Sequence, residues 1–361
     1  MSSSAPLLSI IIPARNAAHY LEQTLPAVRA SSFQHFDLIV VDDSSTDDTR
    51  DVAQRYGSLV VSNDRDPGPG GARNAGVSQA RGAILVFIDA DTRIHTDTLQ
   101  RIRDAFLERP EVAAVFGSYD DNPAEQSIIS SFKNLFHHYV HQTGAAEAST
   151  FWTGCGAIRC EVFERLGGFR TAGLTLMEDI DYGHRMRDAG ERIWLRPDIQ
   201  VQHLKRWSLH ELIYTDVVRR GIPWTIMMLR RGRREKDLNF SARQKVATIV
   251  ACLLLPCLAV AWWLASRDGN AAWIALPAGQ IAMLAALNAG LFRVFARRRG
   301  VFFAVACVPL LVLYYHYGAF AFVAGVVMYW LNHAARPESF PSQVGNAPGQ
   351  AGVRPGSSTE D

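Results

Sequence analysis

The chain has 361 residues, of which 48% are hydrophobic and 20% charged, and this length allows two or three domains with ample hydrophobic cores. Its net charge of +2 hides a split, because residues 1–204 hold 27 acidic and 19 basic side chains whereas residues 205–245 hold 4 acidic and 11 basic. The acidic first half argues against a nucleic-acid partner, and the basic segment beside apolar ones favours contact with anionic lipid headgroups.

The first half alternates short apolar strands with helices, a spacing typical of parallel βαβ units. Strands are predicted at residues 8–13, 38–41, 59–61, 84–88, 112–116 and 151–159, and at 192–195 and 199–204 around Pro197. Asn16 is the candidate N-cap of the first helix, and further helices are predicted near 97–108, at 161–166 and from 177 to Gly190. The pattern predicts an α/β fold: a Rossmann-like mixed sheet with helices on both faces.

Residues 84–88 have the composition of a strand buried on both faces, and Asp89 and Asp91 follow them directly. Two carboxylates brought together cost energy unless a cation neutralises them. Ligands of open α/β sheets gather at the carboxyl ends of strands, and carboxylate oxygens suit Mg²⁺ or Mn²⁺. The alternative is a solvated loop in which Asp91 caps the next helix.

Three other polar stretches are candidate parts of a site. Asp42 and Asp43 end the second strand, where an acid can accept hydrogen bonds from a base or ribose, unless they only form a helix-capping turn. Arg73 follows a glycine-rich run in which backbone can approach a ligand and a guanidinium can hold phosphate, unless it is a surface side chain. Glu178 and Asp179 open a helix whose dipole favours an ionised carboxylate, either as a proton acceptor or as capping acids.

Together these four stretches resemble the family 2 glycosyltransferases of the GT-A fold in order and spacing, over about residues 7–206. The resemblance implies an inverting, metal-dependent enzyme that takes its sugar from a nucleotide-sugar, with a UDP-sugar as the expected donor. It implies metal binding by Asp91 with Asp89, and a base role for Asp179 supported by Glu178. It implies nucleotide contacts from Pro13, Asn16, Asp42, Asp43, Arg73 and Asp89.

An aromatic stretch falls, by the same resemblance, where the sugar meets its acceptor. Here Thr153 and Gly154 are small enough to permit close approach, and Trp152 offers a flat apolar face to a sugar ring; a buried core tryptophan is the alternative. A second aromatic group lies at helical spacing and is expected to be core or the wall of a groove: Phe132, Leu135, Phe136 and Tyr139.

Residues 203–207 are similar to the Gln-x-x-Arg-Trp element of processive polysaccharide synthases, in which the Arg and Trp flank the diphosphate and the acceptor's end. The similarity places Arg206 and Trp207 at those positions. His203 stands where that element has Gln, and no apolar segment is seen before the catalytic stretch. Both departures argue against processivity. His203 is either a metal ligand or a structural histidine.

The second half carries the membrane signals. Residues 207–245 mix apolar and basic side chains, which favours an amphipathic helix lying in the membrane interface over a solvated helix packed on the first domain. Three uncharged stretches, 246–265, 271–292 and 301–331, each reach the roughly 20 residues needed to span a bilayer. The third is long enough to cross once or to re-enter near residues 314–318.

Loop charges give the expected orientation, because arginines at 293–299 and the basic segment belong on the cytoplasmic side. No signal peptide is expected, so the domain at 1–206 is expected in the cytoplasm, followed by the interfacial segment at 207–245 and the membrane domain at 246–331. The Pro-, Gly- and Ser-rich tail at 332–361 is expected to be disordered.

These observations predict a multi-pass protein of the cell (inner or plasma) membrane that moves a sugar to a hydroxyl of a lipid or lipid-linked acceptor. Its expected partners are the nucleotide-sugar, that acceptor and membrane lipids, with no nucleic acid. Three alternatives remain: a polyprenyl-phosphate glycosyltransferase, which needs no hydroxyl base; a processive polysaccharide synthase; and a non-catalytic nucleotide-sugar sensor or membrane scaffold. The full set of acidic motifs argues against the last.

Overall fold

The computed structural model describes residues 7–64, 66–171, 177–232 and 242–334. Its first half is built on a single mixed sheet with strand order β3-β2-β1-β4-β8-β6-β9-β5, and β7 pairs with β9. The strands are β1 (Leu8–Ala14), β2 (Phe36–Asp42), β3 (Leu59–Ser62), β4 (Ile84–Ile88), β5 (Thr92–Ile94), β6 (Ala114–Tyr119), β7 (Glu147–Ala148), β8 (Cys155–Arg159) and β9 (Ile193–His203). The predicted α/β class is confirmed.

Strands β3, β2, β1 and β4 run parallel, whereas β8 is antiparallel to both β4 and β6. Helices cover both faces, so the central strands are apolar on both sides. One face carries α1 (Ala18–Arg29), α2 (Thr49–Arg55) and α4 (Thr98–Glu108). The other carries α3 (Pro69–Val77), α6 (Cys160–Arg165) and α7 (Glu178–Asp188).

Three local predictions for this domain are wrong. Asn16 caps no helix: α1 begins at Ala18, and Asn16 adopts a φ of 49° while its Oδ1 accepts a hydrogen bond from the Thr46 amide at 2.8 Å. The strand expected from residue 151 begins only at Cys155, where pairing with β4 starts. The two strands expected around Pro197 are one strand, β9, whose register with β6 shifts at the proline and so accommodates its missing N–H.

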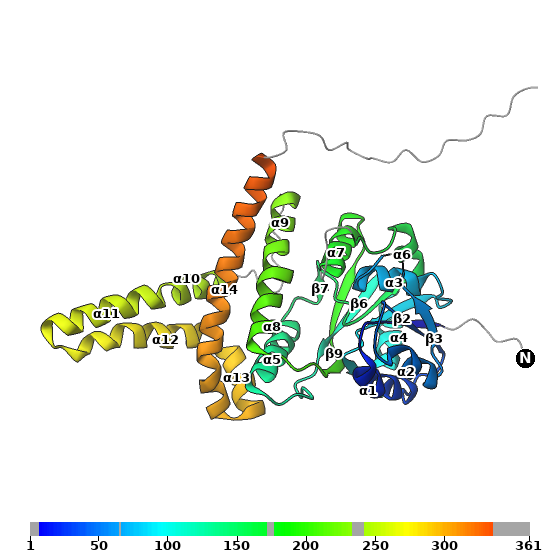
Figure 1. The fold of residues 1–361 in the computed structure, drawn as a ribbon, viewed down its shortest axis with the longest axis horizontal. Coiled ribbons are helices and arrows are strands. Elements are labelled where there is room, and N and C mark those ends of the chain that lie inside the picture. The colour runs from blue at the N-terminus through cyan, green and yellow to red at the C-terminus, as the bar shows by residue number, and fades with distance from the viewer. Residues whose placement is uncertain (1–6, 65, 172–176, 233–241, 335–361) are drawn as a thin grey trace, which may run out of the picture.

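The second half is entirely helical where it is described. Its elements are α8 (Leu209–Tyr214), the π-helix η1 (Thr215–Gly221), α9 (Ile222–Arg231), α10 (Ala242–Cys252), α11 (Leu254–Asp268), the 3-10 helix η2 (Ala271–Ile274), α12 (Ala275–Leu287), α13 (Ala289–Arg299) and α14 (Val301–Ala334). In Figure 1, α11 and α12 extend away from the sheet domain, whereas α14 runs beside α9.

Two described stretches are long and apolar enough to cross a membrane, 242–268 and 301–331. A third candidate, from η2 through α13, is bent by 80° at Asn288. The turn considered near residues 314–318 is absent, because α14 continues through them as one helix. The break lies instead in the second apolar stretch, where the buried Asn288 side chain donates back to the Leu284 carbonyl and accepts from Tyr315 Oη.

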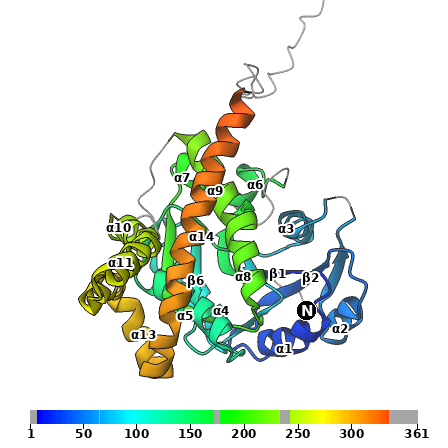
Figure 2. The ribbon, with the colours of Figure 1, turned by 60° about the vertical axis from the view of Figure 1, so that its left-hand side comes forward.

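The remaining helix, α5 (Ile128–Gln142), lies between the sheet and the second half. Its apolar stripe packs against α13 and α14, so the stripe is core, as one of the two interpretations held. In Figure 2, α8 and α9 lie alongside α14, on one side of the molecule.

A buried polar group joins three of these elements. Lys133 of α5 donates to both carboxylate oxygens of Asp216 in η1, at 2.6 and 2.9 Å. Tyr317 of α14 donates its hydroxyl to the same carboxylate at 2.9 Å. Burial alone would raise the pKa of Asp216, but the charges of Lys133 and Arg220 and the hydrogen bonds from Lys133 and Tyr317 together outweigh burial. The pKa is therefore lowered and the carboxylate stays ionised. We call these three residues the α5–η1–α14 joint.

Candidate active site

Three of the predicted stretches converge on Arg73, which lies on α3 and is only 4% exposed. Its Nη2 donates to Asp89 Oδ1 and its Nη1 to Glu178 Oε1, both at 2.7 Å. Burial would lower the pKa of Arg73, but these two carboxylates outweigh it and raise the pKa, so the guanidinium stays charged. Arg73 is therefore not a surface side chain: it ties the end of β4 to the start of α7.

The glycines before Arg73 make this approach possible. Gly68 has a φ of +115°, which is strained for any other residue. A Cβ on Gly71 would lie 1.9 Å from the carbonyl oxygen of Asp66, so only glycine fits there.

Asp179 follows Glu178 at the start of α7. Burial, and then the negative charge of Glu178, raise its pKa to about 7, whereas Arg73, the Thr153 amide and Arg220 of η1 act in the opposite direction. The backbone N and the Oγ1 of Thr153 both lie 3.4 Å from Asp179 Oδ2. A carboxylate with a pKa near neutrality is suited to take a proton, although the helix dipole alone had suggested a fully ionised group.

Asp89 and Asp91 stand at the carboxyl end of β4, with side chains 32% and 25% exposed. Asp91 caps no helix, because β5 follows at once. Its Oδ2 lies 3.7 Å from Nε2 of His203 on β9. Burial would raise the pKa of Asp91, but His203 and then Lys205 outweigh burial, so the pKa is lowered and the group is ionised.

This donor set fits a hard divalent cation. The carboxylates are charged, partly open and placed where α/β sheets hold ligands. The described residues contain no cluster of three His, Cys, Asp or Glu side chains that could hold a metal ion. An ion held by Asp91 and Asp89 would therefore take its remaining ligands from water and from a bound phosphate, as Mg²⁺ commonly does.

The second acidic pair lies at the ends of β1 and β2. Asp43 is 5% exposed, and its carboxylate accepts from Asn63 Nδ2 at 2.6 Å and from the Gly68 amide at 2.9 Å. Asp42 accepts from the Ser45 amide at 3.1 Å. No sequence pattern marks Asn63, because its role depends on a contact between two strand ends.

Pro13 pairs with Val41 across β1 and β2, and the Ala14 carbonyl accepts from the Asp43 amide at 2.8 Å. The Asn16 side chain binds the 42–47 loop through Thr46. The structure thus brings Pro13 and Asn16 to the same edge of the sheet as Asp43.

Trp152 lies within an aromatic group that sequence reasoning only partly found. Its ring is 4.9 Å from Tyr119 and 5.1 Å from both His137 and His141, measured between ring centroids. Tyr119 in turn stacks on His203 at 4.4 Å. The two histidines are four residues apart on α5, a spacing that was available in the sequence as a signal.

Burial keeps the two histidines of this aromatic group uncharged. It lowers the pKa of His141 to about 4 and that of His137 well below its usual range, so both rings are neutral at pH 7. Trp152 is half-buried, with its ring against Gly154, where a Cβ would lie 2.3 Å from the indole. The ring's position therefore requires glycine at 154.

The 203–207 stretch is divided by the structure. Trp207 is buried and its amide donates to Ser130 Oγ at 2.8 Å, with Lys205 Nζ 4.1 Å from the ring centroid. Arg206 is exposed and forms no ion pair with the described residues. The structure therefore joins Trp207 to α5 but does not link Arg206 to the carboxylates.

The mixed sheet, the carboxylates at its strand ends and the helix start at Asp179 define a transferase domain of the GT-A type. A sequence profile described as "Glycosyl transferase family 2" matches residues 9–167. Glycosyltransferase AglE of Haloferax volcanii is 33% identical over 218 residues, covering 57% of this chain and 69% of AglE. The chain belongs to glycosyltransferase family 2.

Other relatives match over shorter stretches. A putative teichuronic acid biosynthesis glycosyltransferase, TuaG of Bacillus subtilis, is 36% identical over 114 residues, which are 30% of this chain and 45% of TuaG. The chain thus spans less than half of TuaG. Among solved structures, the mannosyltransferase PcManGT from Pyrobaculum calidifontis, in complex with GDP-Man and Mn²⁺, has a TM-score of 0.52 and 19% identity, covering 91% of this chain and 88% of that one. The GT-A fold is confirmed.

Proposed function

We propose that the protein is an inverting glycosyltransferase that moves a sugar from a nucleotide-sugar to a hydroxyl of a lipid or lipid-linked acceptor at a membrane surface. The observation that carries the proposal is the Arg73 bridge. It holds the strand end bearing Asp89 and the helix start bearing Asp179 in one place, although Arg73 and Glu178 are 105 positions apart in the sequence. A nucleotide-sugar sensor has no use for a buried carboxylate with a pKa near 7.

In the proposed reaction, Asp179 takes the proton of the acceptor hydroxyl. The acceptor oxygen then forms a bond to the anomeric carbon while the bond from that carbon to the diphosphate oxygen breaks, and the electron pair leaves with the nucleoside diphosphate. One displacement inverts the anomeric centre. Thr153 holds Asp179 on one side, and Glu178 and Arg73 hold the start of its helix.

Asp43, with Asn63 and Gly68 fixing its carboxylate, would hold the base or ribose beside Pro13, Asn16 and Asp42. Trp152 would provide the flat face of the sugar site. A divalent cation, Mg²⁺ or Mn²⁺, held by Asp91 and Asp89 would neutralise charge on the leaving diphosphate. Arg73 is already paired with two carboxylates. Its positive charge would therefore act on the nucleotide site indirectly, from beside Asp89.

The lipid acceptor is proposed from the architecture of the chain. The two apolar stretches at 242–268 and 301–331 follow the catalytic domain, and α9 packs along the second of them. Embedded in a bilayer, these helices would hold the site at its cytoplasmic surface, as the arginines of α13 favour. In this arrangement 7–206 is the catalytic domain, 207–245 the interfacial segment and 246–331 the membrane domain.

The test is transfer of radiolabel from a panel of nucleotide-sugars, beginning with UDP-sugars, into an organic-extractable product in membranes that contain the full chain. Asp179→Asn and Asp91→Asn are compared with Asp104→Asn, a matched change on α4 where the carboxylate's partners among the described residues are its neighbours Arg103 and Gln100. Each reaction is run with Mn²⁺, with Mg²⁺ and with EDTA.

We expect label in the organic phase for the wild type and for Asp104→Asn, and its loss with EDTA and with either site variant. Retained transfer in Asp179→Asn would favour a polyprenyl-phosphate acceptor, which needs no hydroxyl base. A ladder of product lengths would indicate a processive synthase. Binding of a nucleotide-sugar without transfer would overturn the enzymatic proposal.

A further inference from the structure

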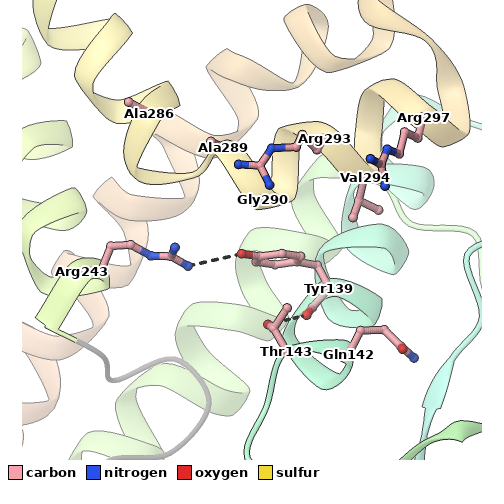
Figure 3. Close-up of a pocket in the computed structure, with 10 residues that line it drawn as sticks. All are labelled: Tyr139, Gln142, Thr143, Arg243, Ala286, Ala289, Gly290, Arg293, Val294 and Arg297. Atoms are coloured by element: carbon pink, nitrogen blue, oxygen red, sulfur yellow. Dashed lines mark hydrogen bonds between the residues drawn. The ribbon is translucent and has the colours of Figure 1, made fainter.

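A cavity of about 460 Å³ lies between the sheet domain and the bent pair α12–α13, away from the catalytic carboxylates. Its walls come from α5, from the start of α10, and from both sides of the 80° bend at Asn288 (Figure 3). Gly290 allows the helices to approach here, because a Cβ at this position would lie 2.4 Å from the hydroxyl of Tyr139. The cavity is thus a consequence of how the break in the second apolar stretch packs on α5.

Three arginines line this cavity, Arg243, Arg293 and Arg297, and among the described residues no acidic side chain lines it. Arg243 reaches across to Tyr139, whose hydroxyl accepts from its Nη2 at 3.3 Å, and Arg293 and Arg297 come from the α13 side (Figure 3). Within the described part of the chain, none of the three forms an ion pair. Three neighbouring guanidinium groups repel one another unless an anion lies between them.

The next two arginines of α13 have a different function. Arg298 forms an ion pair with Asp121, and Arg299 donates to Gln126, so both fasten α13 to the sheet domain. Arg293 and Arg297, one turn apart on the same helix, face the cavity instead. Helix α13 therefore carries two arginines that fasten it to the sheet domain. The other two, Arg293 and Arg297, have no ionic partner in the described part of the chain.

On the side of α12 and α13 the remaining lining is small and apolar, with Ala286, Ala289, Gly290 and Val294, whereas α5 and its C-terminal end contribute Tyr139, Gln142 and Thr143. The apolar residues continue into α12, a helix without charged residues. A ligand that fits would have an anionic head between the arginines and a hydrocarbon part along the helix. Guanidinium groups bind phosphate oxygens in pairs, with matched geometry, and basic pockets between membrane helices on the cytoplasmic side are suited to anionic lipid headgroups.

We propose that this cavity binds the phosphate headgroup of an anionic membrane lipid, with Arg243, Arg293 and Arg297 as its ligands. The inference rests on the membrane placement in the proposed function but not on sugar transfer, and its test needs no donor. The shared chemistry is a phosphate, so a free phosphate ion is the competing source. A lipid is favoured over a free phosphate ion by the apolar part of the lining and by the bend at the end of α12.

The test uses the full chain purified in a neutral detergent, with lipid binding followed by native mass spectrometry. Phosphatidylglycerol and phosphatidylcholine with the same acyl chains are titrated separately, and inorganic phosphate is a third arm. The variant Arg293→Gln/Arg297→Gln is compared with Arg219→Gln/Arg230→Gln, which removes the same two charges from exposed positions of the basic segment outside the cavity. Arg293→Lys/Arg297→Lys keeps the charge and guards against a folding defect.

We expect the wild type to bind one phosphatidylglycerol at least about tenfold more tightly than phosphatidylcholine, since each cation near a phosphate contributes on the order of a fivefold gain. The cavity double variant should lose that preference, the outside double variant should keep it, and the lysine pair should keep most of it. Equal losses in the two glutamine variants would overturn the proposal, because binding would then follow net charge. Inorganic phosphate competing as strongly as the lipid would overturn the lipid assignment. Sugar transfer can fail while this binding persists, and the reverse also holds.

Discussion

Arg73→Met removes the guanidinium that Asp89 and Glu178 share. Arg73 and Glu178 are 4% and 5% exposed, so this half of the bridge is out of water, whereas Asp89 is 32% exposed and screened by solvent. Removing one partner of a buried pair costs about 3–5 kcal/mol, because the other charge is left uncompensated. The Asp89 half adds at most about 1 kcal/mol. The total is about 3–6 kcal/mol, so for a domain of about 200 residues we expect Tm to fall by roughly 6–24 °C.

The assay is thermal unfolding of the detergent-solubilised full chain, followed by near-UV circular dichroism. Arg55→Met is the matched control: its pair with Glu22 is also short, at 2.5 Å, but the side chains are 62% and 40% exposed, so its cost should stay below about 1 kcal/mol. Arg73→Met/Glu178→Met should be less destabilised than the sum of the single variants, because it leaves no buried carboxylate of the pair. If Arg73→Met loses no more than Arg55→Met, the bridge does not hold the site together.

Three further predictions concern the site. Sugar transfer should rise with pH up to about 7 and level off above it, because Asp179 acts only when deprotonated and burial places its pKa there; a rate that is flat between pH 5.5 and 8 would contradict the base role. Asn63→Ala should weaken UDP binding about tenfold or more in calorimetry, since it frees the carboxylate of Asp43, and unchanged affinity would count against Asp43 as a nucleotide contact. Gly154→Ala should lower stability by about 1–3 kcal/mol through overlap with the Trp152 ring; adding Trp152→Leu should restore part of the loss in a thermal melt, and no recovery would rule out that contact.

The strand ends of the site were predictable from the sequence, because the rules behind them are local. The apolar run at 84–88 is a buried strand, and the two acids after it stand at its carboxyl end. What the sequence could not show is how distant stretches meet. The ion pair between Arg73 and Glu178 joins residues that are more than 100 positions apart in the sequence. No local pattern distinguishes Arg73 from a surface arginine.

The membrane half shows the same limit in another form. Hydropathy identifies the apolar stretches, but it does not show where a helix bends, because tertiary contacts decide the position of the bend. Asn288 looks no more disruptive in the sequence than the tyrosines at 314–317, yet its buried side chain marks the 80° break while α14 passes straight through the tyrosines. On α5 the apolar stripe was recognised and the opposite face, with His137 and His141, was not.

The α5–η1–α14 joint has a mechanical consequence. Any swivel of the catalytic domain about α14 would have to pull Asp216 away from Lys133 and Tyr317, and exposing one partner of a buried pair costs about 3–5 kcal/mol. At equilibrium the swivelled form would be rarer than the docked one by a factor of roughly 150 to 5,000. In the proposed membrane arrangement, the protein would therefore hold the sugar site at a fixed distance from the bilayer, and only an acceptor whose headgroup spans that distance would reach it.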